Sequence, residues 1–360
     1  MIKERLLAGT AGRAMSVAVS LHCSGLAFGQ ESPSTTPDSE LSKRTIETSR
    51  VTVYLPTGDD NAIRTAISEL PAEGGIIVLG PALFPVSKSI VIDRDGVELR
   101  GTTSDTILRL TDHANCSVIV IGSMETPIPK IVRNVIVRNL VIDGNRGAQE
   151  FECCGGPCDG GGLSFIRNNG ITVRGTEDVL IENVATHNNR SGGVVLEKYC
   201  RRVHVSNLES YNNEFDGLAA YETEDCTFTQ MKLHHNRSAA MSVDWKFNRN
   251  LITDSQFTEN GSQGIFMRDS ADNQFERLTI RDNGEQGMFI AETREIADSA
   301  SKRNRFNHLI VTGNRTQGIR VNDVSCVDNV ITNSRVSGNK AENISLAAEG
   351  LLIDTDTIGN

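Results

Sequence analysis

Residues 264–290 read GIFMRDSADNQFERLTIRDNGEQGMFI, and the motif that opens this stretch, Gly264-Ile-Phe-Met, returns 23 residues later as Gly287-Met-Phe-Ile. Most intervals between copies are 23 to 25 residues, and the interval from 287 to 318 is longer by 8. A unit of this length cannot bury a core alone and predicts a solenoid, while the period-two apolar alternation within it predicts strands. The further copies begin at Gly170, Gly193, Gly217, Ala240, Gly318 and Asn343.

Polar and aromatic residues recur at fixed points of each unit and support the same register. Asparagine tolerates the left-handed conformation of a corner, and stacked amides can hydrogen-bond along a column. We interpret these columns as structural, with Cys226 as a buried substitute at the head of the second asparagine column. The first column contains Asn189, Asn213, Asn236, Asn260, Asn283, Asn314 and Asn339, the second Asn250, Asn273, Asn304 and Asn329, and the core column Phe228, Phe275 and Phe306.

The segment before the repeats predicts a cap for one end of the solenoid. Ala62, Ile63, Ala66, Ile67 and Leu70 follow an acidic start at helical spacing, and Pro71 ends the helix. Short apolar runs follow it and predict strands. A helix in this place can cover an end that would otherwise expose the core and the strand edges.

The helical cap is followed by Gly-Gly-Ile-Ile-Val-Leu at 74–79 and by Gly-Val-Glu-Leu-Arg-Gly at 96–101. This combination resembles the right-handed parallel β-helix proteins of the pectate-lyase-like superfamily, over about residues 55–355. The resemblance implies an all-β, single-stranded right-handed parallel β-helix with an N-terminal capping helix. We expect this domain at 51–360, with its cap region at 51–101 and regular coils at 170–355. That architecture carries lyases, hydrolases, epimerases and binding proteins.

The N-terminus predicts export to the periplasm or the exterior. Basic residues precede a short apolar run, and small residues at Ala27 and Gly29 suit cleavage of a signal peptide at 1–29. Residues 30–50 are polar and rich in Pro and Ser, which is typical of a disordered leader. The apolar run is too short to anchor in a membrane, so we expect no membrane insertion.

Cysteine content and charge limit the partners. Cys153, Cys154 and Cys158 crowd into one loop, where a disulfide staple is favoured over a zinc site because no fourth ligand has suitable spacing. The net charge of −10 argues against nucleic acid. It does not exclude an acidic polysaccharide, which a local basic groove can bind. The oligomeric state is not predicted.

Outward positions of one strand column carry the candidate site. The fourth residue after each small residue points away from the core, and neighbours in this column lie about 4.8 Å apart. We expect a catalytic group of Tyr221, Asp244, Lys246 and Arg268, with substrate contacts from Arg174, Glu197, Phe266, Phe289, Arg320 and Asn322. The two loops at 148–169 and 294–303 are expected to border the same face. The alternative is that these outward charges only make the sheet soluble.

The residue types suggest chemistry on a uronate. An arginine could hold the carboxylate, the two phenylalanines could stack on sugar rings, and Tyr221 or Lys246 could take the C5 proton if a neighbouring cation lowered its pKa. Glu197 and Asp244 could instead bind Ca²⁺, the one cofactor we consider. They could also act as an inverting hydrolase pair, since two coils separate them by about 9.6 Å.

The coils around Tyr211–Tyr221, with Cys226-Thr-Phe and Asn236-Arg-Ser-Ala-Ala-Met, resemble those of mannuronan carbon-5 epimerases and alginate lyases. The Asp-Pro-His motif of those enzymes is absent from this sequence. The resemblance therefore concerns the coils and not the catalytic residues. From the residue types of the outward column we expect an exported lyase or epimerase acting on a uronate-containing polysaccharide by proton abstraction. An inverting hydrolase and a non-catalytic carbohydrate-binding β-helix remain the alternatives.

Overall fold

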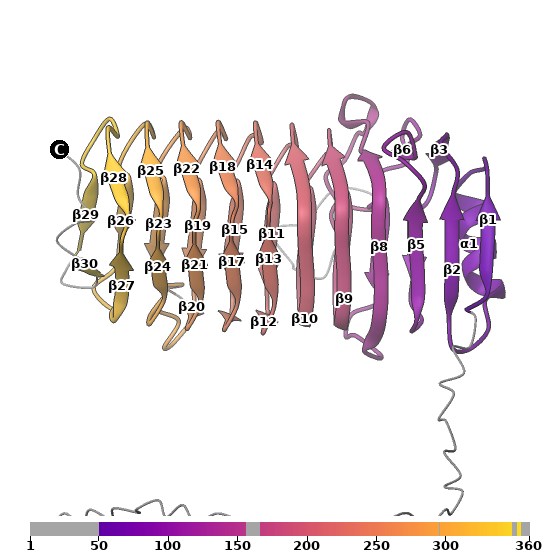
Figure 1. Ribbon diagram of the computed structural model, residues 1–360, viewed down its shortest axis with the longest axis horizontal. Helices are drawn as coiled ribbons and strands as arrows, with labels where there is room; N and C mark the ends of the chain where they lie inside the picture. The colour runs from indigo at the N-terminus through magenta and orange to yellow at the C-terminus, as the bar shows by residue number, and fades with distance from the viewer. Residues whose placement is uncertain (1–49, 156–165, 295, 348–350, 354–360) are drawn as a thin grey trace, which may run out of the picture. The chain divides into compact units, whose positions relative to one another are not determined.

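The computed structural model describes residues 50–155, 166–294, 296–347 and 351–353. In these residues successive coils of the chain place strands on three parallel sheets (Figure 1). The first sheet contains β4 (Ile90–Ile92), β7 (Ile119–Gly122), the beginnings of β9 (Ile171–His187) and β10 (Val194–Tyr211), β11 (Leu218–Tyr221), β15 (Met241–Asp244), β19 (Ile265–Arg268), β23 (Met288–Ala291), β26 (Ile319–Val321) and β29 (Ile344–Leu346).

The second and third sheets complete each coil, and the long strands β8, β9 and β10 pass from one sheet into the next. The second contains β1 (Thr52–Leu55), β2 (Gly75–Leu79), β5 (Val97–Gly101), part of β8 (Val132–Asp143), β13 (Thr227–Thr229), β17 (Leu251–Thr253), β21 (Gln274–Glu276), β24 (Arg305–Asn307), β27 (Asn329–Thr332) and β30 (Leu351–Ile353), preceded by β12 (Thr223–Glu224), β16 (Phe247–Asn248) and β20 (Ser270–Ala271). The third contains β3 (Leu83–Val86), β6 (Ile107–Leu110), β14 (Lys232–His234), β18 (Gln256–Thr258), β22 (Thr279–Arg281), β25 (Ile310–Thr312) and β28 (Arg335–Ser337).

The predicted all-β solenoid and its helical cap are confirmed. Helix α1 (Asp60–Glu69) begins after Asp59, whose carboxylate accepts the backbone N–H of Ala62 at 2.9 Å, and it buries Ile63 and Ile67. A short 3₁₀ helix, η1 (Arg146–Ala148), precedes the cysteine-containing loop. The predicted signal peptide and leader lie outside the described residues. No helix of the described ranges has the length and apolar character needed to cross a bilayer.

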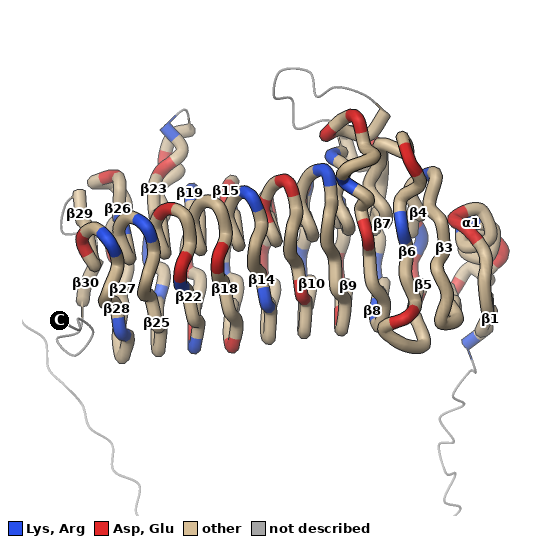
Figure 2. The backbone as a smooth tube through the Cα atoms, turned by 90° about the horizontal axis from the view of Figure 1, so that it is seen from above, with Lys and Arg blue, Asp and Glu red and all other residues tan. Residues whose placement is uncertain are grey.

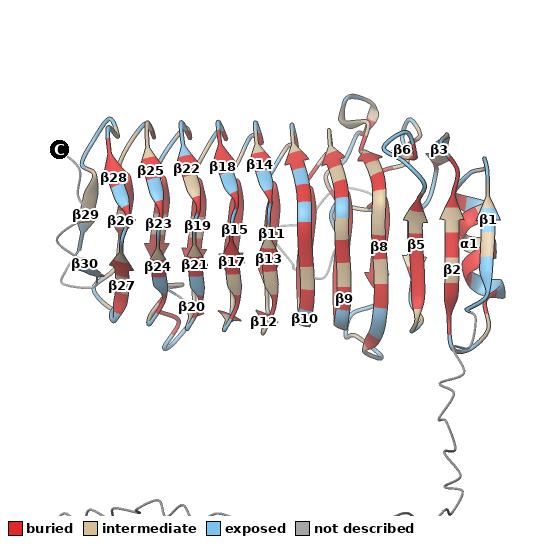
Figure 3. Ribbon diagram, viewed as in Figure 1, coloured by how far each residue is buried: buried red, intermediate tan, exposed pale blue. Residues whose placement is uncertain are grey.

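Alternate side chains of each strand point into the coil and form one continuous apolar core (Figure 3). The predicted phenylalanine column lies in this core, and the Phe275 and Phe306 rings stack with their centroids 5.1 Å apart. The first asparagine column hydrogen-bonds from coil to coil, for example from Asn236 Nδ2 to Asn260 Oδ1 at 2.9 Å. Asn250 Oδ1 accepts the backbone N–H of Cys226 at 2.9 Å, which places the cysteine at the head of the second column.

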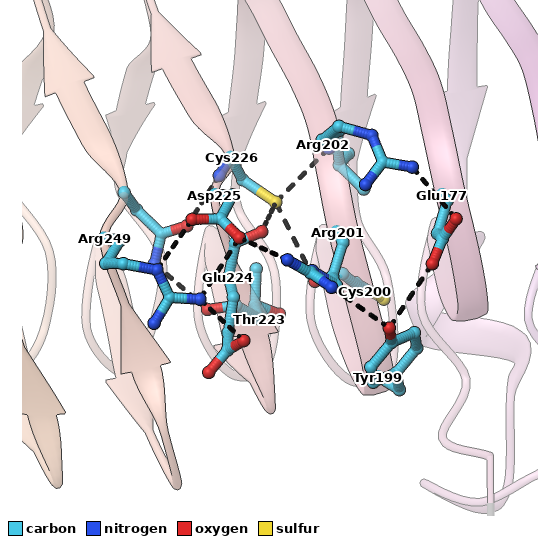
Figure 4. A network of polar contacts seen from close by, with 12 residues as sticks. Glu177, Tyr199, Cys200, Arg201, Arg202, Thr223, Glu224, Asp225, Cys226 and Arg249 are labelled. Atoms are coloured by element: carbon cyan, nitrogen blue, oxygen red, sulfur yellow. Dashed lines mark hydrogen bonds and ion pairs between the residues drawn. The ribbon is translucent and has the colours of Figure 1, made fainter.

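Charges alternate in sign along the corner that precedes the second sheet. Each arginine of this ladder makes a bidentate ion pair with the aspartate one coil earlier, so that Arg249 Nε and Nη2 contact Asp225 at 2.8 and 3.1 Å (Figure 4). Arg201 also donates to Asp225, at 2.8 Å. All members have positive φ and occupy equivalent corners; they are Asp178, Arg202, Asp225, Arg249, Asp272 and Arg303.

This ladder predicts an acid-sensitive contribution to stability. The hydrogen bonds from Arg249, followed by those from Arg201, hold the pKa of Asp225 at about 2. Because this pKa is depressed in the folded protein, the stabilisation is present above the unfolded pKa and is lost as the pH falls through the folded value. We expect the thermal midpoint to fall between about pH 4 and pH 2, and to fall less steeply in Arg249→Gln. Melting curves of the wild type, Arg249→Gln and the control Lys340→Gln across this range measure the effect. The same dependence of the thermal midpoint on pH in all three proteins would contradict the account.

Candidate functional site

The outer column of the first sheet reads arginine, carboxylate, tyrosine, carboxylate, arginine. Arg174 pairs in register with Glu197, and Tyr221 pairs with Asp244. The neighbouring registers Leu196–Ala220 and Val243–Met267 place Glu197 beside Tyr221 and Asp244 beside Arg268. The predicted column therefore exists, with Tyr221 at the centre of a symmetric order of charges and about 4.8 Å between members.

Arg174 lies at the first end of this column and is completely buried. Its guanidinium donates to the carbonyls of Ser123 and Met124 at 3.2 and 3.0 Å and to the hydroxyl of Thr126 at 2.7 Å. Its Nε lies 3.0 Å from Glu197 Oε1. The segment that follows β7 thus covers Arg174, which corrects the expectation that its guanidinium meets a substrate: the observed contacts support Glu197 instead.

Glu197 is itself largely buried, and this burial raises the pKa of its carboxyl group while Arg174 acts against the shift. Asp244 is buried as well and accepts hydrogen bonds from the Trp245 backbone N–H at 2.8 Å and from Thr293 Oγ1 at 3.1 Å. Its other oxygen forms an ion pair with Arg268. Both carboxylates are thus engaged by neighbouring groups, and they do not come together as a pair.

Tyr221 occupies the middle of the column. Burial raises the pKa of its phenol, and the nearby Asp216 and Asp244 carboxylates raise it further, because charge of the same sign opposes ionisation. The Trp245 ring packs edge-on against it, with the centroids 6.5 Å apart. The Arg167 guanidinium acts on this pKa in the opposite direction, but its effect is outweighed, so the expected net lowering of this pKa by a cation does not occur. Tyr221 remains a protonated phenol at neutral pH, which suits a proton donor rather than a proton acceptor.

Asp216 is a further candidate residue on this face, outside the predicted column. It directly precedes Gly217, and its Oδ1 accepts the backbone N–H of Ala239 at 2.9 Å. Burial raises the pKa of this carboxyl to about 6, with the Arg167 guanidinium acting in the opposite direction. An acid in this place was visible in the sequence, because the equivalent positions from Asn169 to Gln317 otherwise hold uncharged residues.

Arg268 is the partly exposed cation of the column, with 38% of its side chain accessible. Its guanidinium lies 5.0 Å from the centroid of the Phe266 ring, and Phe266 stacks on Phe289 at 5.5 Å and 12°. The rings thus turn faces toward each other, so that contact with a sugar would involve ring edges. Arg320 follows Phe289 in register. Asn322 Nδ2 donates to Asp323 at 3.1 Å, which ties its amide to the corner.

Lys246 is exposed on the turn after Asp244, and its backbone N–H donates to the Asp269 carbonyl at 2.9 Å. Its ammonium group forms no ion pair within the described ranges, so it is available to an anionic ligand. As for a metal, no three His, Cys, Asp or Glu side chains gather around a common point in the part of the chain that the structure describes. The Ca²⁺ hypothesis for Glu197 and Asp244 gains no supporting geometry, since each faces an arginine.

The chain segments flanking this face protrude on its side. In Figure 2 the described parts of the segments after β23 and before β9 protrude from the edge along which β15, β19 and β23 lie. Thr293, at the start of the first of these segments, reaches back to Asp244. In the second segment, the Ser117 N–H donates to Cys154 Sγ at 3.1 Å. Cys158 lies outside the described residues, so the disulfide staple stays a prediction.

Comparison with known proteins agrees with this fold. Residues 195–358 match the family model described as "Right handed beta helix region". This match and the three parallel sheets agree on a right-handed parallel β-helix fold. A search of curated proteins found no match.

Several solved structures are similar to this chain. ORF18 of Geobacillus virus E2 gives a TM-score of 0.64 at 13% identity, over 82% of this chain and 60% of that one, so this chain spans well under the full length of the viral protein. An endo-xylogalacturonan hydrolase from Aspergillus tubingensis gives 0.55 at 16% identity, over 86% and 94%. The A-module of a mannuronan C-5 epimerase from Azotobacter vinelandii gives 0.50 at 16% identity, over 85% and 99%. At these identities the likeness shows the fold alone.

Proposed function

We propose that this protein is an exported enzyme that acts on a uronate-containing polysaccharide, as a lyase or an epimerase, on the outer face of the first sheet. The observation that carries the proposal is the column in which Tyr221 lies beside Asp244 and Asp244 is ion-paired with the partly exposed Arg268, with the Asp216 carboxylate close enough to Tyr221 to raise the pKa of its phenol. Titratable groups with pKa values shifted in this way are typical of acid–base sites. The similar structures titled as a mannuronan epimerase and an endo-xylogalacturonan hydrolase are consistent with a polysaccharide substrate.

The reaction uses these groups in order. The C5 proton of a uronate is weakly acidic because it is α to the carboxylate, and Asp216 accepts it as a carboxylate. The electron pair moves into the sugar carboxylate, where Arg268 stabilises the added negative charge. Tyr221 then donates a proton. Donation to the departing glycosidic oxygen, as the bond from C4 breaks, completes an elimination, and donation to C5 from the opposite face completes an epimerisation.

Asp244 has a positioning role in this scheme. Its carboxylate fixes the Arg268 guanidinium through the ion pair, while Trp245 and Thr293 hold the carboxylate itself. The inverting hydrolase alternative would need Glu197 and Asp244 to face a water and a glycosidic oxygen. Their burial and their contacts with arginine disfavour that role.

A panel of polysaccharides separates the alternatives. A lyase produces unsaturated uronates, which absorb in the ultraviolet, and an epimerase changes the ratio of C5 epimers without scission. New reducing ends that lack this absorbance would indicate hydrolysis and would overturn the proposal. Binding of a polymer that stays chemically unchanged would favour the non-catalytic alternative.

The role of Asp216 predicts a particular pH dependence. The group acts in its deprotonated form, so kcat/KM should fall as the pH drops through about 6, by about tenfold per pH unit. Above this value the profile should be flat through neutral pH, because the raised pKa of Tyr221 keeps the phenol protonated. We expect Asp216→Asn to lose turnover at every pH. A wild-type profile that stayed level between about pH 4.5 and 8, in protein shown to remain folded, would contradict the assignment.

A further inference from the structure

The chain leaves the first sheet through turns whose length differs from coil to coil. After β11 a single residue, Glu222, connects Tyr221 to the second sheet. The neighbouring coils on both sides use two residues, Lys198–Tyr199 and Trp245–Lys246, and the strand register shifts at the first of them. These two-residue turns follow Glu197 and Asp244 directly, so they stand on either side of the Tyr221 coil.

Both two-residue turns have an unusual backbone. Lys198 and Tyr199 have φ values of 58° and 72°, and Trp245 and Lys246 have values of 50° and 64°. Bulky residues rarely adopt this left-handed conformation, and pairs of them persist only where the surrounding structure holds them. Such outliers gather at functional sites, which directs attention to what these turns present.

Each two-residue turn consists of one aromatic residue and one lysine. The aromatic residue anchors the turn: Arg201 donates to the Tyr199 hydroxyl at 3.5 Å and this hydroxyl donates to Glu177 at 3.3 Å (Figure 4), while Trp245 packs on Tyr221. The lysine of each turn has no such anchoring contact. Within the described residues neither ammonium group forms an ion pair, although Lys198 acts electrostatically on Glu197 and Lys246 on Asp269.

We infer that Lys198 and Lys246 bind the carboxylates of the two sugar residues that flank the reacting one, so that the substrate is a run of consecutive uronates. This inference rests on the proposed function. An extended chain of pyranose residues advances by roughly one strand spacing, about 4.8 Å, per residue. A polymer lying along the stack therefore places one sugar over each of β10, β11 and β15, with the reacting sugar over Tyr221 and one lysine beside each neighbour.

Titration of the full-length Tyr221→Phe protein with uronate oligomers tests the inference without turnover. Trp245 is the only tryptophan of the chain, so its intrinsic fluorescence reports binding inside the site. We expect affinity to step up at the trimer, the shortest oligomer that reaches both lysines. Lys198→Ala and Lys246→Ala should each weaken trimer binding about tenfold, as expected for loss of one charge-assisted hydrogen bond. Lys232→Ala, an exposed lysine on β14, serves as the matched control.

Trimers with one terminal carboxylate reduced to an alcohol complete the test. The protein with both lysines should bind such a trimer as weakly as a single lysine variant binds the full trimer. When the missing carboxylate is the partner of the missing lysine, combining the two changes should weaken binding no further than either change alone. Unchanged binding in both lysine variants, or an equal loss in Lys232→Ala, would overturn the inference. If the wild-type protein turns over a polyuronate but the lysine variants bind the trimer as the wild type does, only this inference is rejected. If affinity rises at the trimer but no polyuronate is turned over, only the proposed function is rejected.

Discussion

Tyr221→Phe is expected to lower kcat on a uronate polymer by roughly 10²- to 10⁴-fold, the range that one positioned acid or base contributes. The substitution removes only the phenol oxygen. The ring and its edge-on contact with Trp245 remain, so the neighbouring carboxylate–arginine pairs keep their positions. Initial rates at saturating substrate measure the effect, and KM should change little because the hydroxyl acts in the transition state.

A matched control is available in β1, at the N-terminal end of the described coils. Tyr54 is an exposed tyrosine in β1, and Tyr54→Phe should retain full turnover. The thermal midpoints of both variants should lie close to that of the wild type. Turnover of Tyr221→Phe within a few-fold of the wild-type rate would remove Tyr221 from the mechanism.

The second large effect concerns stability: Asn260→Ala should lower the free energy of unfolding by about 3 kcal/mol, because it leaves several buried groups without partners. The Asn260 amide donates to Asn283 Oδ1 at 3.0 Å and to the Leu233 carbonyl at 3.1 Å. Its Oδ1 accepts both the backbone N–H and the side-chain amide of Asn236, at 3.1 and 2.9 Å. Alanine satisfies none of these groups, and the site is too enclosed for water to replace the amide in full.

Urea unfolding followed by two probes measures this loss and shows whether the coils unfold together, which repeat proteins need not do. Asn61→Ala, an exposed position in α1, is the control and should change stability by less than about 0.5 kcal/mol. Equal stability of the Asn260 and Asn61 variants would show that the asparagine column does not hold the coils together.

The architecture could be predicted because its causes are local and repeated. A small residue, an inward alternation and a corner asparagine recur with a fixed period, and any one register that buries the apolar positions also aligns Asn236 with Asn260 and Phe275 with Phe306. The same register predicts Tyr221 beside Asp244, and the two residues pair in the structure. Columns along a solenoid are a direct consequence of sequence spacing.

The chemistry of the site was less accessible, because it depends on contacts outside the repeat. Arg174 is buried by residues 123–126, which precede the regular coils and carry no periodic signal. Asp216 directly precedes Gly217, the small residue that begins its repeat, so it lies outside the outward column. Its pKa is raised by burial, which the sequence does not reveal. The two-residue turns at 198–199 and 245–246 each add one residue to their coil. The spacing between the small residues varies by that much in any case, so it does not show where the extra residue lies.

Proton removal from C5 is the central claim, and one measurement tests it for a lyase and an epimerase alike. A polyuronate that the enzyme acts on is incubated with it in deuterium oxide, and the C5 proton signals are followed by nuclear magnetic resonance. We predict that these signals disappear with the wild-type protein, through deuterium at C5 or a double bond at C5, and persist with Asp216→Asn, which lacks the carboxylate that accepts the C5 proton. Scission or modification of the polymer with every C5 proton retained would contradict the account.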